Sequence, residues 1–184
     1  KIVDITDALN LDYHLSYPFL FKENDNIYMI PETNANRRLE IYKCVNFPDK
    51  WELYSTAFED EIVSDAHFYN DENDQKWLFL NKRTQTTSVD LELYIYRVDS
   101  LKLNKIESHK QNPVIINSKI ARNGGAIFKY NNDLIRPSQY NAEAIYGRGL
   151  NLNKISTLNL EHYKETCLHR VMPNFHKNLI GVHH

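Results

Sequence analysis

Three short stretches of the chain place polar side chains directly before an apolar run: residues 16–18 (Ser-Tyr-Pro), 64–66 (Ser-Asp-Ala) and 122–124 (Arg-Asn-Gly). Asp65 is the acid among them, and Glu32 ends the apolar run that follows the first stretch. Two carboxyl groups about 6.5–9.5 Å apart can hydrolyse a glycosidic bond, one as the acid and one as the base. Asp65 and Glu32 are therefore the candidate catalytic residues. The alternatives are a strand-capping role for Asp65 and a solvated or sugar-binding loop carboxylate at Glu32.

Other polar residues near these points are candidates for contact with a ligand. Arg136 lies inside an apolar run, where an unpaired charge is costly. It is expected to form a structural salt bridge, or else, as the family resemblance described below implies, to pair with a carboxylate of the site or an anionic ligand. Gln139 follows in the same run, and its amide can hydrogen-bond a sugar hydroxyl. The expected substrate-binding residues are His14, Ser16, Tyr17, Asn123, Arg136, Gln139 and His183.

Histidines near the starts of the apolar runs raise the question of a metal ion, because imidazole is a common metal ligand. His14, His67 and His183 occupy such places, but they lack the paired spacing typical of a metal site. No cofactor is therefore expected, and a central metal ion held by these histidines is the less favoured alternative. Cys44 and Cys167 also lack metal spacing and are expected to be buried thiols. The histidines expected at the surface are His109, His162, His169 and His176.

The elements that must position these residues recur three times along the chain. An apolar stretch, a polar turn and an aromatic-rich stretch occupy residues 18–31, 66–80 and 126–137, and a second hairpin follows each. Self-similarity of roughly 40–50 residues with about four strands per unit is typical of propeller blades. The predicted fold class is all-β: a five-bladed β-propeller-like domain, incomplete in this chain, of which about three and a half blades are seen.

The chain is predicted to form one domain over residues 1–184, because no linker or shift in composition divides it. Its blades are expected at roughly 14–60, 62–110, 120–168 and, in part, 171–184. Propellers close with about 4–8 blades, and an open arc leaves sheet edges exposed. The chain is therefore expected to be part of a longer propeller. The alternative is closure between its N-terminal segment and its last hairpin.

Composition excludes several classes of function. The net charge is −2 without a basic block, so no nucleic-acid partner is expected. No run of about 18 apolar residues is present, so no membrane span is expected. The sequence also lacks a glycine-rich phosphate loop, a Gly-x-Ser-x-Gly elbow and a His-Glu-x-x-His pair. Glycine is scarce at 5 residues, and Asn and Asp are expected to replace it in the turns at 23–26, 70–75 and 131–133.

A series of short motifs occurs in order along nearly the whole chain: HLSYPF (14–19), IYMIPE (27–32), FPDKW (47–51), SDAHF (64–68), ARNGG (121–125), IRPSQ (135–139), YG (146–147) and GVH (181–183). Their order resembles the propeller domain at the N-terminal side of plant glucosamine inositolphosphorylceramide transferases and its bacterial relatives, some of them fused to formyltransferase-like domains. That family is in turn similar to five-bladed glycoside hydrolases such as arabinanases and fructosidases. The resemblance implies a saccharide or glycoconjugate as ligand and a fused or associated transferase domain. The localisation is left unknown, with a soluble protein of the bacterial cytoplasm or periplasm as the expectation.

The resemblance further implies three axial carboxylates for hydrolysis, and the chain departs from that pattern. Such hydrolases supply the acid near the third blade, but no Glu lies at residues 118–126. The family's usual first blade has no counterpart, since residues 1–12 match only its end. The leading hypothesis is a glycosidase-like propeller that binds a saccharide on its axial face and can hydrolyse a glycoside. The alternatives are a non-catalytic glycan or glycolipid recognition domain accompanying a fused transferase, and a structural propeller for protein contacts.

Overall fold

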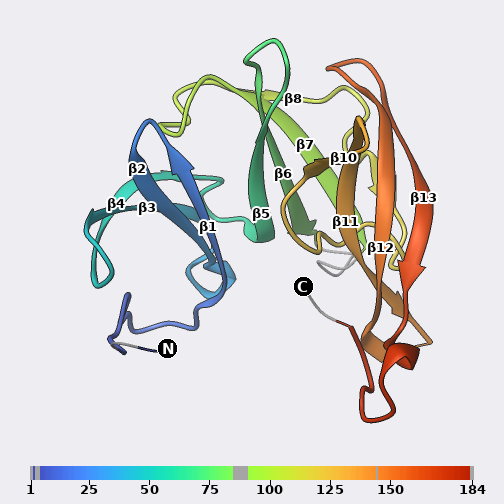
Figure 1. The fold of residues 1–184 in the computed structure, drawn as a ribbon. Coiled ribbons are helices and arrows are strands. Elements are labelled where there is room, and N and C mark those ends of the chain that lie inside the picture. Colours follow the sequence, from blue (N-terminus) through green and yellow to red (C-terminus); the bar gives the residue numbers. More distant parts are fainter. Residues whose placement is uncertain (1, 3–4, 85–90, 144, 183–184) are drawn as a thin grey trace.

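The computed structural model describes residues 2, 5–84, 91–143 and 145–182. Within these residues the chain forms three antiparallel sheets and two short 3-10 helices, which confirms the predicted all-β class. Figure 1 shows the three sheets following one another in an arc, with the strands labelled in chain order. None of the described helices is long and apolar enough to cross a membrane.

Each of the three sheets is built from strands that are consecutive in the sequence. The first sheet has the order β1-β2-β3-β4, and its strands are β1 (Ser16–Glu23), β2 (Asn26–Glu32), β3 (Leu39–Asn46) and β4 (Lys50–Ala57). The second contains β5 (Ile62–Asn70), β6 (Lys76–Arg83), β7 (Glu92–Val98), β8 (Ile106–Ser108) and β9 (Ile115–Ile116), the last paired with β7. The third contains β10 (Phe128–Tyr130), β11 (Asp133–Ala142), β12 (Ile145–Leu158) and β13 (Tyr163–Val171). The 3-10 helices are η1 (Asn34–Asn36) and η2 (Pro173–Phe175).

Tight turns join neighbouring strands, and short polar residues replace glycine in them as predicted. Asn24 and Asp25 connect β1 to β2 with φ angles of 48° and 63°. Asn131 and Asn132 connect β10 to β11 with φ angles of 46° and 66°. Two successive residues at positive φ are typical of the hairpin turn whose twist matches the flanking strands. Asn and Asp tolerate this conformation because their side chains can hydrogen-bond locally.

The second sheet is buried on both faces, and β6 shows this most clearly. Leu78 and Leu80 belong to the hydrophobic core shared with the first sheet. Trp77 and Phe79 belong to the core shared with the third sheet. Successive side chains of a strand point to opposite faces, so the apolar run in β6 serves two cores at once. This explains why the run is continuous rather than alternating.

The first strands of the first two sheets carry matching irregularities. The register between β1 and β2 shifts between Ser16 and Phe19, and that between β5 and β6 shifts between Ser64 and His67. Within these bulges Tyr17 and Asp65 have φ angles of 45° and 48°. Positive φ is uncommon for residues other than glycine, and bulges often re-aim a side chain near a functional site. The fold therefore redirects Tyr17 and Asp65 at equivalent points of two repeats.

Two predictions about individual side chains are wrong. Cys167 is exposed, because it lies on β13, the outermost strand of the third sheet, while Cys44 is half-buried. His109 is buried rather than at the surface. The chain turns back after β8, so the His109 amide donates to the Ile95 carbonyl at 3.1 Å and its Nδ1 accepts from the Gln111 amide at 3.0 Å.

Replacement of Phe79 by alanine tests the core between the second and third sheets. Phe79 is fully buried and its ring stacks on that of His67 with centroids 5.5 Å apart. We expect Phe79→Ala to lower the free energy of unfolding by about 3–5 kcal/mol, because it leaves a cavity. Urea denaturation measures the loss. Phe128→Ala, at a ring that is 41% exposed, is the control, with an expected change within about 0.5 kcal/mol. Equal effects at the two positions would contradict the assigned core.

Candidate functional site

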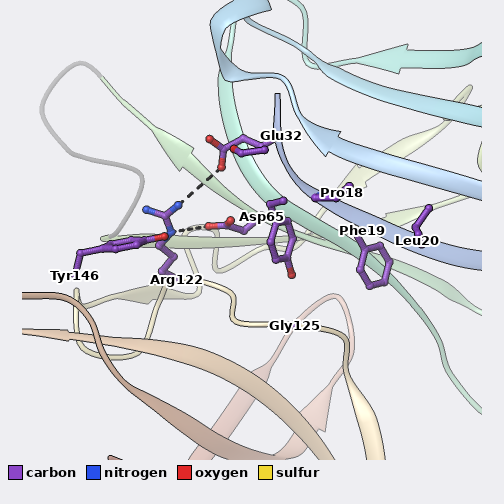
Figure 2. Close-up of a pocket in the computed structure, with 10 residues that line it drawn as sticks. Pro18, Phe19, Leu20, Glu32, Asp65, Arg122, Gly125 and Tyr146 are labelled. Atoms are coloured by element: carbon purple, nitrogen blue, oxygen red, sulfur yellow. Dashed lines mark hydrogen bonds and ion pairs between the residues drawn. The ribbon is translucent and has the colours of Figure 1, made fainter. Parts of the chain in front are cut away.

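A cavity of about 470 Å³ opens where the three sheets meet. The first sheet contributes the residues at the start of β1 and Glu32 at the end of β2. The second contributes Asp65 from the bulge of β5, and Arg122 comes from the loop between β9 and β10. The third contributes Tyr146 from β12. Figure 2 shows these side chains converging from strands far apart in the sequence.

Arg122 joins the charged groups of this cavity. Its Nε donates a hydrogen bond of 2.7 Å to Asp65 Oδ2, and its Nη2 lies 3.8 Å from Glu32 Oε2. The guanidinium carbon lies 5.0 Å from the centre of the Tyr146 ring, within the range of a cation–π contact. One guanidinium therefore links two carboxylates and an aromatic ring. The Asp65 carboxylate is held by Arg122, with its side chain 2% exposed.

Glu32 is less tightly engaged than Asp65. Its Oε1 accepts a hydrogen bond of 2.8 Å from Asn34 Nδ2. The 3.8 Å between its Oε2 and Arg122 Nη2 exceeds the length of a hydrogen bond. A hydroxyl group can both donate and accept, so a hydroxyl at this point can accept from the guanidinium and donate to the carboxylate. The spacing of the two groups is compatible with a hydroxyl group that bridges them.

Tyr17 adds a phenol to the same cavity. Burial raises the pKa of Tyr17, and the negative charge of Asp65 raises it further against the opposing effect of Arg122. The phenol therefore stays neutral at physiological pH. A neutral phenol can donate as well as accept a hydrogen bond, which a phenolate cannot.

The segment of residues 120–123, which carries Arg122, is fixed from the second sheet by Asn81. Asn81 lies in the second half of β6 and is fully buried. Its Oδ1 accepts a 2.8 Å hydrogen bond from the Asn123 amide, and its Nδ2 donates at 3.0 Å to the Ala121 carbonyl. Asn123 Nδ2 in turn donates at 2.9 Å to the Asp65 carbonyl. The backbone of the segment and the bulge of β5 are thus held by buried amide groups.

The third sheet holds the 120–123 segment through Arg136 and Gln139. Arg136 Nη2 donates at 2.7 Å to the Ile120 carbonyl, and Nη1 donates at 3.1 Å to Asn123 Oδ1. The backbone N–H of Gln139 donates at 2.9 Å to the Arg122 carbonyl. The segment is therefore hydrogen-bonded to both neighbouring sheets, and the direction of Arg122 depends on how these sheets pack.

Arg136 is itself neutralised by an acid of the same sheet. Its Nε and Nη2 donate to the two oxygens of Glu165 at 2.7 and 2.6 Å, a bidentate pair. The Tyr163 hydroxyl donates to the same carboxylate at 2.5 Å. The Arg136 side chain is 0% exposed and that of Glu165 5%. Of the two expected arrangements for Arg136, the structure contains the internal salt bridge.

The structure distributes the candidate residues over several places. Ser16, Tyr17, Glu32 and Asp65 line the cavity. The three residues behind it, all buried, are Asn123, Arg136 and Gln139. His14 is exposed ahead of β1 and does not line the cavity, and His183 lies outside the described residues.

The histidines that the structure describes do not assemble around the cavity. His67 is fully buried, with its ring between Phe79 and Phe19 at centroid distances of 5.5 and 5.9 Å. It belongs to the packing between sheets. Among the residues that the structure describes, no three or more His, Cys, Asp or Glu side chains are grouped so that they could hold a metal ion.

Arg122 and Tyr146 both line the cavity, although the sequence does not single out Arg122 as a ligand-binding residue and favours core packing over stacking on a sugar ring for Tyr146. Arg122 lies in the polar stretch 122–124 that opens the third repeat, and this position was the available signal. Nothing local marks its partners, which come from other sheets. Tyr146 is one of 12 tyrosines, and only its 53% exposed ring distinguishes it from those in the cores.

The fold and the site define an all-β domain whose mixed-charge cavity is assembled from three sheets. The chain belongs to the family described as "Glucosamine inositolphosphorylceramide transferase 1, N-terminal", whose model matches residues 3–180. It is 37% identical over 161 residues to glucosamine inositolphosphorylceramide transferase 1 of Oryza sativa subsp. japonica and 33% identical over 163 residues to that of Arabidopsis thaliana. Each alignment covers 86% of the chain.

The chain spans about a fifth of the length of these relatives, 21% and 20% respectively. The predicted resemblance to the plant transferase family is thereby confirmed. The similarity to glycoside hydrolases stays a prediction. The two relatives are plant proteins, so they give no support to the expected bacterial compartment.

Replacement of Arg136 by methionine tests its role in holding the 120–123 segment. Removal of one partner of a buried ion pair leaves the other charge uncompensated. We expect Arg136→Met to lower the free energy of unfolding by about 3–5 kcal/mol, measured by urea denaturation. Arg97→Met is the matched control, because Arg97 pairs with Glu107 at 2.6 Å on a side chain that is 38% exposed. Its expected loss is below about 1 kcal/mol.

The cluster around Glu165 also predicts a dependence of stability on alkaline pH. Desolvation is the main cause that raises the pKa of Tyr163 well above 10.0, and Glu165 adds to it against Arg136. The folded pKa exceeds the unfolded pKa, so stability is complete below pH ~10 and falls as pH rises above it. Above this pH the free energy of unfolding decreases with rising pH. We expect Tyr163→Phe to make this decrease smaller by up to about 1.4 kcal/mol per pH unit.

Urea denaturation at a series of pH values from 8 upwards measures this slope. Tyr130→Phe, at an exposed ring of β10, is the control and should leave the slope unchanged. The slope becomes smaller in Tyr163→Phe without vanishing, because desolvation also raises the pKa of Tyr42 and Tyr96. An unchanged slope in Tyr163→Phe would show that its hydroxyl is as solvated in the folded state as in the unfolded one.

Proposed function

We propose that the chain is a glycan or glycolipid recognition domain that accompanies a glycosyltransferase, and that it binds a saccharide in the cavity around Arg122. The observation that carries the proposal is the group formed by Glu32, Arg122 and Tyr146. A carboxylate and a guanidinium 3.8 Å apart match the donor and acceptor of a sugar hydroxyl. The exposed ring beside them offers an apolar surface. Saccharide rings present both hydroxyl groups and apolar faces.

The comparisons support this assignment. The matched family is named for the N-terminal part of a transferase, and the chain covers about a fifth of each relative. We propose that the transfer reaction belongs to another part of such a protein and that this domain binds a glycan of the donor or the acceptor. The proposed partner is a fused or associated transferase domain. The relatives' names point to glucosamine and inositolphosphorylceramide as the sources of that glycan.

For the architecture, we propose that the three sheets are blades of one five-bladed β-propeller-like domain that is incomplete in this chain. Support comes from the two cores, each shared by neighbouring sheets that pack face to face. Support also comes from the cavity, to which the first strands β1 and β5 both contribute. A propeller forms its ligand site at the point toward which its blades converge.

Glycoside hydrolysis is the second candidate function, because Glu32 and Asp65 line the same cavity. A glycosidase needs one carboxyl group to donate a proton to the leaving oxygen. Here Asp65 is held by the Arg122 guanidinium at 2.7 Å, which favours its use in binding. Release of nitrophenol from 4-nitrophenyl glycosides distinguishes the two. Turnover that Asp65→Asn abolishes would favour the hydrolase.

Replacement of Glu32 by glutamine tests the proposed saccharide site. Glutamine keeps the shape and an acceptor for Asn34, but it loses the charge that strengthens a hydrogen bond from a sugar hydroxyl. We expect binding to weaken about fivefold, since a hydrogen bond to a charged group contributes about 1 kcal/mol more than one between neutral groups. Calorimetry with the methyl glycosides of glucose, glucosamine, galactose, mannose and glucuronic acid measures the effect.

The matched control is Glu107→Gln, at a half-exposed glutamate paired with Arg97 away from the cavity. It should bind as the unmodified protein does. Thermal unfolding of both variants checks that the fold is retained. Absence of binding to every glycoside in the unmodified protein, or equal binding in Glu32→Gln, would overturn the site.

A further inference from the structure

Residues 109–112, which follow β8, are fastened to the second sheet by hydrogen bonds to β7. The His109 amide donates to the Ile95 carbonyl at 3.1 Å. The Asn112 side chain donates to the same carbonyl at 2.7 Å and accepts from the Ile95 amide at 2.9 Å. These residues therefore form a fixed turn on the outer side of the second sheet.

The same turn is hydrogen-bonded to the third sheet. Its partner is the hairpin of residues 159–163, which joins β12 to β13 (Figure 1). The Lys110 amide donates to the Leu160 carbonyl at 2.9 Å, and Gln111 Oε1 accepts from the Tyr163 amide at 3.1 Å. The contact between the turn and this hairpin is the joint between the second and third sheets.

The His109 ring fits the joint in its neutral form. It is 2% exposed, and its Nδ1 accepts a hydrogen bond of 3.0 Å from the Gln111 amide. The one proton of the neutral ring therefore belongs to Nε2, which is buried without a hydrogen-bond partner among the described residues. A second proton would lie on Nδ1 and point at the Gln111 N–H, so that hydrogen bond would be lost. It would also place a charge in the interior, which is costly.

The surroundings of His109 also disfavour a charged ring. Burial lowers the pKa of His109, whereas the backbone of His162 and Asn159 opposes this shift. The imidazole of His162 lowers the pKa further, and Glu161 raises it. The charged and titratable neighbours on the packed elements are Lys110 paired with Glu161, Arg97 paired with Glu107, and His162. Each pair is neutral overall, so neither supplies an unpaired negative charge for an imidazolium.

A continuous set of hydrogen bonds leads from the joint to the cavity. Gln111 holds the backbone of Tyr163, and the Tyr163 hydroxyl donates to Glu165 at 2.5 Å. Glu165 in turn holds Arg136 through two hydrogen bonds. Arg136 donates to the segment of residues 120–123. Loss of the joint would therefore remove one support from the segment that places its arginine in the cavity.

We propose that His109 is the acid-sensitive element of this joint: protonation of its ring separates residues 109–112 from the hairpin and loosens the support of Arg122. In the open joint the ring is solvated and binds a proton near pH ~6.5. The closed joint is thus favoured above about this pH, and the preference is lost as the pH falls below it. An effect on saccharide binding rests on the proposed function, because Arg122 is assigned to the ligand there.

Amide hydrogen exchange of the whole chain, followed by NMR at about pH 7 and about pH 5.5, tests the proposal without any saccharide. Carboxylates with ordinary pKa values stay ionised over this range. We expect the protection factors of the Lys110 and Tyr163 amides to fall about five- to tenfold, because a proton bound in the open state alone shifts the equilibrium up to about tenfold per pH unit. Amides of β2 and β3, in the first sheet, should keep theirs within about twofold.

The Gln139 amide reports on the segment that carries Arg122, because it donates to the Arg122 carbonyl at 2.9 Å. We expect its protection factor to fall in the same direction. A fall at Lys110 and Tyr163 with none at Gln139 would contradict the link to Arg122. An equal fall at every amide, the first sheet included, would overturn the joint as a local element.

Replacement of His109 by asparagine removes the titration. The asparagine Oδ1 can take the place of Nδ1 as acceptor for the Gln111 amide, and it binds no proton in this pH range. We expect the protection factors in His109→Asn to differ by less than about twofold between the two pH values. His169→Asn, at an exposed histidine of β13, is the matched control and should keep the full fall. The same fall in His109→Asn as in the unmodified protein would overturn the proposal.

A second measurement needs no variant and stands if His109→Asn fails to fold. The ¹⁵N chemical shifts of the His109 ring report its tautomer and its protonation. We expect the Nε2–H tautomer at neutral pH and a ring that stays neutral wherever the Lys110 amide stays protected. A ring that becomes charged near pH ~6.5 while the Lys110 amide keeps its protection would overturn the proposal, because the closed joint would then hold an imidazolium.

Discussion

The buried Arg136 guanidinium constrains the structure around the candidate site. A charge without exposure to solvent is tolerated when its donors are satisfied. Glu165 takes two of them, and the others reach Asn123 and the carbonyls of Ile120 and Ala121. The segment that carries Arg122 must therefore follow the path on which it can accept these hydrogen bonds. Asn81 imposes the same requirement from the second sheet. The orientation of Arg122 in the cavity therefore depends on the hydrogen bonds that the buried Arg136 requires.

Part of this arrangement follows from the sequence. The repeated apolar runs predict the strands, and the polar residues before each run predict where Tyr17 and Asp65 lie. The partnership of Arg122 with Asp65 does not follow, because it joins residues from different sheets and depends on how those sheets pack. The same limit applies to Arg136, whose partner Glu165 lies two strands away in the third sheet.

The wrong predictions have a common cause. His109 lies in a polar stretch, yet a turn of the backbone brings it against β7 of the second sheet, where it is buried. Cysteine is a residue type that is usually buried, yet Cys167 lies on an outer strand and is exposed. Local polarity indicates which residue types favour water. It does not report whether another element covers them, and that information arises from contacts between distant parts of the chain.

The burial of the second sheet on both faces has a consequence for cooperativity. Each hydrophobic core is formed by side chains of two neighbouring sheets, so each sheet depends on its neighbour for burial, as the units of a repeat protein do. Loss of one outer sheet would expose one face of β6, so opening at either end of the arc propagates toward the middle. The cavity takes side chains from all three sheets. A molecule bound there would stabilise the packing of all three sheets together, since its binding free energy would be lost when any one sheet separates.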